Sequence, residues 1–145
     1  MLGSATVFIS MGIQVAVVVM MIRYLMKIMN RDDASTTCFA FDSYVISIVL
    51  LMLFTGHMVQ IGIWAALFMF LGEFSEFQTA YYHSTVNFAS LGYGDIVMSE
   101  KWRLLGALEA SNGVLMFGLS AGTMLPVMTN LFSRRKADNR NGQDS

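Results

Sequence analysis

The chain has 145 residues with one cysteine; 55% of the residues are hydrophobic, 13% are charged, and the net charge is -1 at pH 7. Together with a mean hydropathy of +0.56, these values are typical of a membrane protein rather than a soluble domain. They exclude an intrachain disulfide and a cysteine-based zinc site, and they give no indication of a nucleic-acid partner, so we expect none.

The first long apolar stretch runs from about Ala5 to Met26 and contains Gln14 and Arg23. It exceeds the roughly 20 residues that a helix needs to cross a bilayer. Its basic residues follow the apolar stretch instead of preceding it, which favours a retained span over a cleaved signal peptide. We therefore predict an N-terminal transmembrane helix within residues 1–30, followed by a short polar linker over 31–43.

Two further apolar stretches run from about Tyr44 to Leu71 and from about Leu104 to Phe132. We predict a transmembrane helix for each, because only a helix satisfies its own backbone in hydrocarbon. An ionisable group inside a span is a functional candidate by default. For His57, in the second stretch, we nevertheless favour a neutral, hydrogen-bonded histidine between helices over a pH sensor.

The distribution of lysine and arginine predicts the orientation of the spans. Seven basic residues follow the first or the third span, and two lie between the second and the third. Because cytoplasmic segments carry the excess of basic residues, we expect the linker and the C-terminus inside and the N-terminus outside the cell membrane. The tail, residues 133–145, could contact anionic lipid through Arg134, Arg135 and Lys136, although the orientation signal alone explains these residues.

The segment between the second and third spans is too apolar for a solvated loop and too interrupted for a fourth span. Ser75 with Gln78 three residues later has capping-box spacing, and about thirteen residues of helix, roughly 20 Å, could follow. The strand-like sequence from Ser90 to Asp95, SLGYGD, comes next. Irregular backbone at membrane depth requires burial in protein or a water-filled path, so we predict a re-entrant segment.

The glycines of this sequence indicate what the irregular backbone could do. If Gly92 and Gly94 adopt positive φ while Leu91 and Tyr93 do not, successive carbonyl groups can turn to the same side. The side chains of Leu91 and Tyr93 would then point into surrounding protein. One row of carbonyl groups cannot replace the water shell of a cation, but several rows around an axis could.

At these residues the chain resembles the potassium channel family, whose filter sequence is Thr-Val-Gly-Tyr-Gly. The counterpart here is Ser90-Leu91-Gly92-Tyr93-Gly94, followed by Asp95. The resemblance covers residues 44–132, as an ion-channel pore module, and leaves the first span as an extra helix. It implies an all-α integral membrane protein with three transmembrane helices, a re-entrant pore helix and selectivity-filter loop, and a homotetrameric pore.

The resemblance also implies roles for single residues. The carbonyl groups of Ser90, Leu91, Gly92 and Tyr93 would coordinate dehydrated K⁺, and the Ser90 hydroxyl would complete the innermost site. Asp95 would be an anchor behind the outer mouth. Because Val86 stands where some members have a carboxylate that pairs with this aspartate, the partner of Asp95 is expected to be either Tyr82 or Trp102.

The third span carries the remaining candidates. We expect Glu109 to make a structural hydrogen bond behind the filter instead of acting in conduction. For Asn112, which precedes Gly113, the sequence leaves open whether the side chain faces the cavity of the pore. The hinge and gate candidates are Gly113, Phe117, Gly118 and Pro126. Gly118 also forms a GxxxG pair with Gly122, which allows helices to approach closely.

The sequence therefore predicts a potassium-selective channel with K⁺ as the permeant ion. One alternative is a poorly selective cation channel, because Ser90 stands where threonine is usual and loosens the innermost site. The other is a non-conducting membrane subunit that modulates a partner. No Ser-His-Asp order, metal-ligand cluster or phosphate-binding loop occurs in the sequence, so we expect neither catalysis nor a cofactor.

Overall fold

The structure, a computed structural model, describes residues 2–29 and 39–141, and these ranges contain four helices and no strand. The long helices are α1 (Leu2–Met29), α2 (Phe39–Phe70) and α4 (Arg103–Asn141), and the short one is α3 (Phe77–Phe88). The long helices contain apolar segments long enough to cross a membrane, at Gly3–Ile28, Ala40–Phe70 and Arg103–Leu131. The predicted all-α fold with three long apolar helices is confirmed.

Two helices extend beyond the predicted apolar stretches, and one of them is α2, which begins at Phe39 and not near Tyr44. Helix α4 does not stop near Phe132 but continues to Asn141, through most of the predicted tail. The residues after the apolar stretch include no glycine or proline up to Asn141, so the helix can outlast the hydrophobic pattern that marks the span. The linker residues 31–38, with Cys38, lie outside the described residues.

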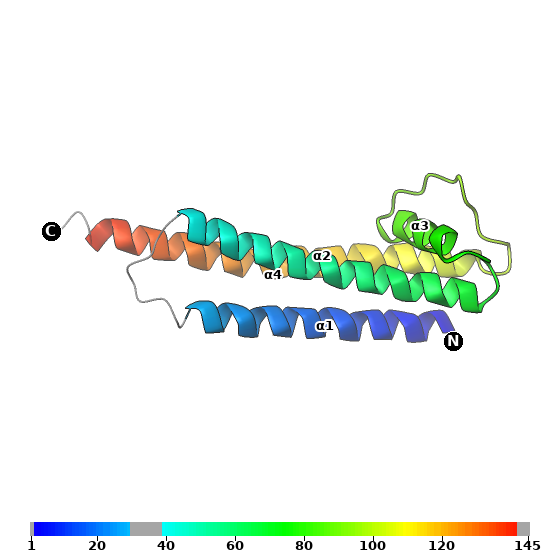
Figure 1. The fold of residues 1–145 in the computed structure, drawn as a ribbon, viewed down its shortest axis with the longest axis horizontal. Helices are drawn as coiled ribbons and strands as arrows, with labels where there is room; N and C mark the ends of the chain where they lie inside the picture. The colour runs from blue at the N-terminus through cyan, green and yellow to red at the C-terminus, as the bar shows by residue number, and fades with distance from the viewer. Residues whose placement is uncertain (1, 30–38, 142–145) are drawn as a thin grey trace.

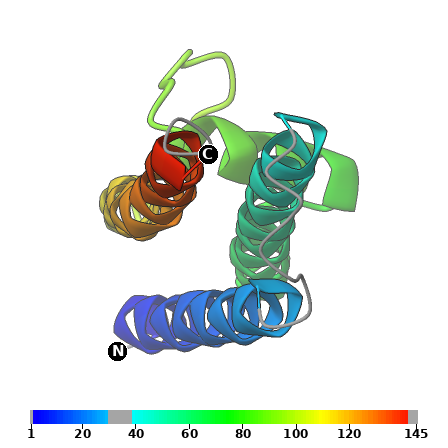
Figure 2. The same cartoon turned by 90° about the vertical axis from the view of Figure 1, so that its left-hand side faces the viewer.

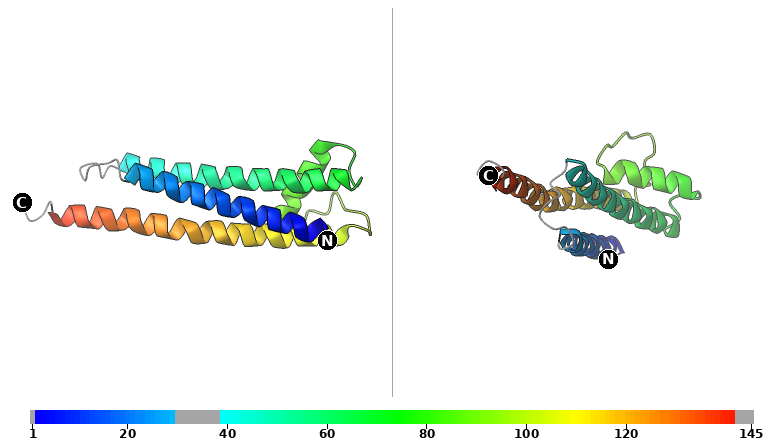
Figure 3. Two further views of the ribbon diagram at one scale, coloured as in Figure 1. Left: turned by 90° about the horizontal axis from the view of Figure 1, so that it is seen from below. Right: turned by 60° about the vertical axis from the view of Figure 1, so that its left-hand side comes forward.

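The helices form one bundle in which α2 and α4 lie antiparallel (Figure 1). Helix α3 packs on both of them near the C-terminal end of α2, and α1 packs on the opposite side of the pair (Figure 2). Seen from below, α1 runs obliquely, from the start of α4 to the start of α2 (Figure 3). At one end of this path a Cβ at Gly3 would meet the side chains of Leu105 and Leu108 of α4. The N-terminus and α3 thus lie at one end of the bundle, and the C-terminus lies at the other.

The surface of the long helices is as apolar as their packed faces. Large hydrophobic side chains are exposed on each of them, for example Phe8, Phe54 and Leu104 at 72%, 59% and 73%. Such helices suit a bilayer, because lipid tails cover the exposed apolar side chains and packing against neighbours decides which face is buried. The buried side chains form two clusters, one beside α3 that includes Trp64 and Phe88, and one at the opposite end that includes Met21 and Val49.

A chain of buried polar side chains holds α1 to the other two long helices. The Nε2 group of Gln14 donates to Ser120 Oγ at 2.9 Å, and Gln60 Nε2 donates to Gln14 Oε1 at 2.9 Å. Ser120 Oγ also lies 3.1 Å from His57 Nε2. Because Ser120 accepts from Gln14, its own hydrogen is available for the imidazole nitrogen. The hydrogen-bonded histidine between helices that we favoured for His57 is confirmed.

Candidate functional site

The short helix α3 begins one residue later than predicted. Glu76 is its N-cap, in an extended conformation and without a side-chain cap, and the Glu76 carbonyl accepts the first helical hydrogen bond, from Ala80, at 3.1 Å. Ser75 lies outside the N-cap position, so the predicted capping box of Ser75 and Gln78 is wrong. The helix has 12 residues, far fewer than a bilayer crossing requires.

The C-terminal end of α3 is closed by a Schellman motif. Ser90 N–H donates to the Asn87 carbonyl at 2.8 Å, and Leu91 N–H donates to the Val86 carbonyl at 2.9 Å. This motif requires the residue after the C-cap to be left-handed, and Ser90 has φ +56°. Glycine normally occupies this position because it adopts positive φ without steric cost. Serine therefore holds a strained conformation at the junction between the helix and the loop.

The loop after α3 continues the same backbone alternation. Gly92 and Gly94 have φ values of +59° and +73°, whereas Leu91 and Tyr93 do not have positive φ. The expected conformations of both glycines are confirmed, and Ser90 extends the pattern by one residue. The side chains of Leu91 and Tyr93 are 53% and 65% exposed. A single chain therefore does not supply the surrounding protein in which we expected them to be packed.

Two hydrogen bonds from α3 position the loop beyond Gly94. The Tyr82 hydroxyl donates to Asp95 Oδ2 at 2.7 Å, which identifies Tyr82 rather than Trp102 as the partner of Asp95. At the next residue of α3, His83 Nδ1 lies 3.2 Å from the Ile96 carbonyl oxygen. Trp102 instead packs against the buried cluster beside α3.

His83 is a site residue that the sequence interpretation missed. Its Nε2 lies 2.8 Å from the Asn87 amide, and because the Ile96 carbonyl can only accept, Nδ1 carries the proton and Nε2 accepts from Asn87. The i, i+4 spacing of His83 and Asn87 could have indicated this pair. With 5% of its surface exposed, His83 connects α3 to the loop from inside the protein.

The far end of the loop is held by Glu73, in the segment that connects α2 to α3. Ser99 donates both its N–H and its hydroxyl to the carboxylate of Glu73, the hydroxyl at 2.8 Å. Glu73 follows directly after the turn that ends α2. The loop is thus tied to the protein after its exposed part, first at Asp95 and Ile96 and then at Ser99.

The pKa values of Asp95 and His83 at this site are shifted in opposite senses with respect to charge. The hydrogen bond from the Tyr82 hydroxyl holds the pKa of Asp95 below its usual value, because it favours the charged carboxylate. Burial lowers the pKa of His83, because the imidazolium is poorly solvated there. The carboxylates of Glu73 and Asp95 act in the opposite direction on His83 but do not cancel the effect of burial.

Behind α3, the third span contributes the buried carboxyl of Glu109. This side chain is fully buried and lies beside Ser84 and Asn87 of α3. Neither carboxyl oxygen makes a hydrogen bond of normal geometry with a described residue. Asn112, one turn later, is 3% exposed, so in the single chain it faces the protein interior.

Gly113 allows α4 to touch the end of α3. A Cβ at this position would overlap the carbonyl oxygen of Phe88, the last residue of α3. The structure therefore assigns Gly113 a packing reason that the sequence did not reveal. One turn further, the Phe117 ring lies edge-on to His57 with 4.8 Å between centroids and 5.7 Å from the Phe88 ring.

The other gate candidates lie on the open side of α4. A Cβ at Gly118 or Gly122 would meet no atom of the described chain within 4 Å, so the GxxxG pair packs against no helix of the same chain. Pro126 lies inside α4, which continues through it. Gly118 and Gly122 lie near the middle of α4, and Pro126 lies in its C-terminal half, which extends away from α3 (Figure 1).

Comparison with known proteins agrees with this arrangement. The family model described as an ion channel matches residues 43–130, which include α3, the loop and most of α2 and α4. No match was found among curated proteins or solved structures. Since the family model covers more than half of the sequence, this membrane protein belongs to the ion channel family.

Proposed function

We propose that the protein is the subunit of a homotetrameric potassium channel. The observation that carries the proposal is the backbone from Ser90 to Gly94, in which φ is positive at residues 90, 92 and 94. Such alternation is what turns successive carbonyl groups to one side, and a ring of carbonyl oxygens can replace the hydration shell of K⁺. In this proposal the carbonyls of Ser90, Leu91, Gly92 and Tyr93 bind the ion.

Exposure of the loop supports assembly of several copies. Leu91 and Tyr93 are large side chains, and both are more than half exposed in a single chain. The residues that follow them in the loop, in contrast, are hydrogen-bonded to α3 and to Glu73. Four chains around one axis would bring four carbonyl rows together and cover these side chains. Helix α3 would also favour a cation, because the negative end of its dipole lies where the backbone from Ser90 to Gly94 begins.

The anchors around the loop provide the rigidity that selectivity requires. Asp95 and Ile96 are hydrogen-bonded to Tyr82 and His83, and Ser99 is hydrogen-bonded to Glu73. A coordination site discriminates between ions only if its oxygens cannot follow a smaller ion inward, or if their number is fixed. We assign these six residues to filter support, together with Glu109 behind α3.

Orientation is part of the proposal. The excess of basic residues places the C-terminus and Cys38 in the cytoplasm and the N-terminus, α3 and the loop outside. A membrane-impermeant thiol reagent should then fail to label Cys38 in intact cells and label it after lysis. Labelling in intact cells would reverse the orientation.

The experiment that tests the function is a reversal-potential measurement on purified protein in liposomes. With K⁺ on one side and Na⁺ on the other, the potential should approach the K⁺ equilibrium value. A reversal potential near zero with robust currents would favour the poorly selective cation channel, for which strained Ser90 is the structural argument. Absence of current would favour the non-conducting subunit.

A matched pair of glycine variants links the current to the loop. Gly92→Ala places a side chain where φ is +59°, whereas Gly12→Ala changes a glycine of α1 at which a Cβ meets no atom within 4 Å. We expect Gly92→Ala to abolish selective K⁺ current and Gly12→Ala to retain it. Equal currents from both variants would contradict the assignment of the loop as the filter.

A further inference from the structure

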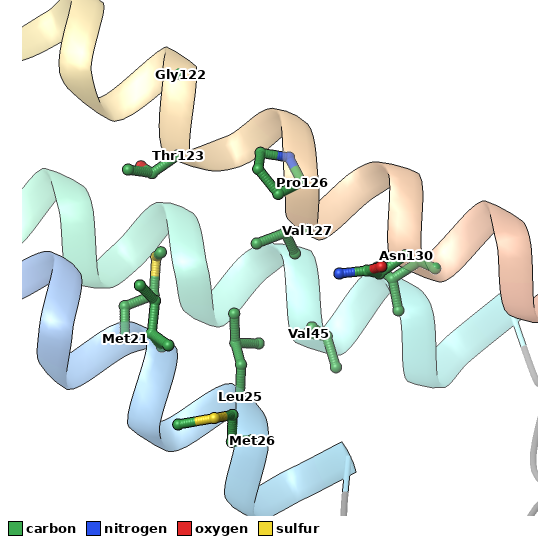
Figure 4. A pocket seen from close by; sticks show the side chains of 11 residues that line it. Met21, Leu25, Met26, Val45, Gly122, Thr123, Pro126, Val127 and Asn130 are labelled. Carbon is green, nitrogen blue, oxygen red and sulfur yellow. The ribbon is translucent and has the colours of Figure 1, made fainter.

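An apolar cavity of about 430 Å³ lies between the three long helices, at the end of the bundle remote from α3 (Figure 4). Helix α1 contributes Met21, Ile22, Leu25 and Met26, and α4 contributes residues between Gly122 and Leu131. The volume falls in the range of roughly 300 to 1,000 Å³ that small-molecule sites occupy in proteins. All of its lining residues belong to one chain.

The lining of the cavity excludes a polar ligand. Thr123 and Asn130 are its two polar side chains, and the Thr123 hydroxyl already donates to the Ser120 carbonyl at 2.8 Å. A water molecule needs two or more polar partners to occupy a buried space, and apolar cavities stay dry but bind apolar molecules. The lining therefore suits a hydrocarbon chain.

The cavity lies at a depth in the membrane where lipid acyl chains can provide that hydrocarbon. Its lining residues lie within the apolar segments Gly3–Ile28, Ala40–Phe70 and Arg103–Leu131, toward the end at which α1 stops and α2 begins (Figure 1). A cavity open toward the lipid at this depth is surrounded by acyl chains of one leaflet.

Charge on the same helices selects the kind of lipid. Arg23 and Lys27 are exposed on α1 next to the lining residues Ile22 and Met26. Beyond the cavity α4 carries four more basic residues and one acidic residue, Asp138, while α2 has Asp42 in its first turn. The excess of positive charge favours an anionic headgroup, by about fivefold in affinity for each basic residue near the surface.

We propose that this cavity, hereafter the acyl site, binds one acyl chain of an anionic phospholipid whose headgroup is held near Arg23 and Lys27. Gly122 and Pro126 of α4 both line the site. Because proline has no N–H, the Gly122 carbonyl lacks its helical hydrogen-bond partner, and α4 bends more easily there. A bound acyl chain fills the space into which α4 can bend. The bound acyl chain should therefore change how readily the channel opens, and this regulatory role rests on the channel function proposed above.

Lipid retention tests the site without reference to current. Protein purified from mixed phosphatidylglycerol and phosphatidylcholine bilayers is analysed by native mass spectrometry for lipid bound per chain. We expect retention of phosphatidylglycerol in preference to phosphatidylcholine. Gly122→Leu should reduce retention at least fivefold, because its side chain enters the acyl site. Gly118→Leu is the matched control, since both glycines have open space around a Cβ but only Gly122 lines the site.

The headgroup is tested with Arg23→Gln and Lys27→Gln together, which should lower the preference for phosphatidylglycerol over phosphatidylcholine by at least fivefold. Equal retention by Gly122→Leu and Gly118→Leu would overturn the acyl site, and an unchanged headgroup preference would overturn the anionic assignment. A change in oligomeric mass in Gly122→Leu, with lipid retention unchanged, would mean that a second copy covers the cavity.

The same preparations separate the site from the proposed function. Retained lipid in protein that carries no K⁺ current would refute the channel and leave the acyl site in place. Selective K⁺ current from protein that retains no lipid would do the reverse. In the wild-type channel, open probability should change as the phosphatidylglycerol fraction rises, and this response should be lost in Gly122→Leu; a retained response would overturn the regulatory role.

Discussion

Ser90 occupies the left-handed position that ends α3, and its side chain determines how much that conformation costs. A non-glycine residue in this region costs roughly 1–2 kcal/mol, and a β-branched residue is a greater outlier there than serine. The conformation at φ +56° thus accounts for serine where threonine was the expected residue. It also means that the innermost part of the proposed filter is set by the way a helix ends.

The stability of Ser90 variants tests this explanation. We expect Ser90→Gly to raise the free energy of unfolding by up to about 1 kcal/mol, because glycine adopts positive φ without strain. Ser90→Thr should lower it by a similar amount, since the branched Cβ crowds the backbone at positive φ. Denaturation of the purified protein in mild detergent measures both. A threonine variant as stable as the wild type would show that this conformation is not the one that the protein adopts.

His83 should make stability depend on pH. Burial lowers its pKa below the usual 6.5, so the unfolded chain takes up a proton at a higher pH than the folded chain does. Stability should therefore fall as the pH decreases below about 6.5, and the loss should end once the pH is below the lowered pKa. Protonation would also set the Nε2–H of His83 against the Asn87 amide, which is a donor in the neutral arrangement.

His83→Gln is the control for this pH dependence, because glutamine offers a donor and an acceptor but does not titrate. Thermal unfolding between pH 5 and pH 8 should show a smaller slope in this variant than in the wild type. Identical slopes would assign the pH dependence to other groups. Asp95 contributes separately and at lower pH, because its pKa is lowered by Tyr82 and its stabilising effect is lost only as the carboxylate is protonated.

Helix α1 is an integral part of the helix bundle and not a loose extra helix. Its Gln14 is fully buried and bonds both α2 and α4 through Gln60 and Ser120. Polar bonds between helices hold particularly well where lipid offers no alternative partner, although each contributes only about 0.6–2 kcal/mol in measured cases. The same chain of bonds reaches His57, whose ring contacts Phe117 of α4 and Phe88 of α3.

Replacing Gln14 should detach α1. Gln14→Leu removes two hydrogen bonds and leaves Gln60 and Ser120 without this partner, so we expect a loss of about 1–3 kcal/mol. Val15→Leu, at a side chain that is 56% exposed, is the control and should have little effect. Unfolding in bicelles monitored by circular dichroism gives the difference. If Gln14→Leu is as stable as Val15→Leu, the polar chain does not hold α1.

The contact between α3 and α4 depends on Gly113 in the same way. Gly113→Ala forces its Cβ onto the carbonyl oxygen of Phe88, and such overpacking typically costs about 1–3 kcal/mol. Gly118→Ala, five residues further along the helix and without neighbouring atoms within 4 Å, should be tolerated. Denaturation midpoints of the two variants separate a packing glycine from a hinge, since a hinge role alone predicts no loss of stability in Gly113→Ala.

The elements were predictable to the extent that hydrophobicity alone determines them. The three spans follow from the three long apolar stretches, because a bilayer imposes a minimum length on a helix that crosses it. The shortness of α3 follows from the interrupted sequence between Leu71 and Leu104. The partners of Gln14 and His57 were not predictable, since they lie 106 and 63 residues away in the sequence at Ser120. The continuation of α4 beyond Phe132 also carried no hydrophobic signal.

The loop shows the same division at the level of single residues. The positive φ of Gly92 and Gly94 could be predicted because only glycine adopts such values easily. Ser90 could not, because its conformation follows from the hydrogen bonds that close α3. Tyr82 and Trp102 were equal candidates for Asp95 in the sequence, and the direction in which α3 turns its side chains decided between them.

For the molecule as a whole, the proposed tetramer makes a quantitative prediction. A single chain leaves Leu91 and Tyr93 exposed, and one carbonyl row cannot enclose a cation, so each conducting unit should need four intact loops. Gly92→Ala disturbs the loop but not the long helices, because the backbone at Gly92 has φ +59° and a Cβ there would meet no atom within 4 Å. The variant should therefore assemble with wild-type chains.

If one altered loop abolishes conduction, the current from mixed assemblies is set by the fraction of all-wild-type tetramers. Reconstitution of co-expressed chains at equal amounts should reduce the K⁺ current per assembly to about one sixteenth, because four independent choices must all be wild type. Mixing with Gly12→Ala should leave the current unchanged. A fall to one half would mean that each chain conducts alone, and a fall to one quarter would mean a dimer; either result would contradict four loops around one axis.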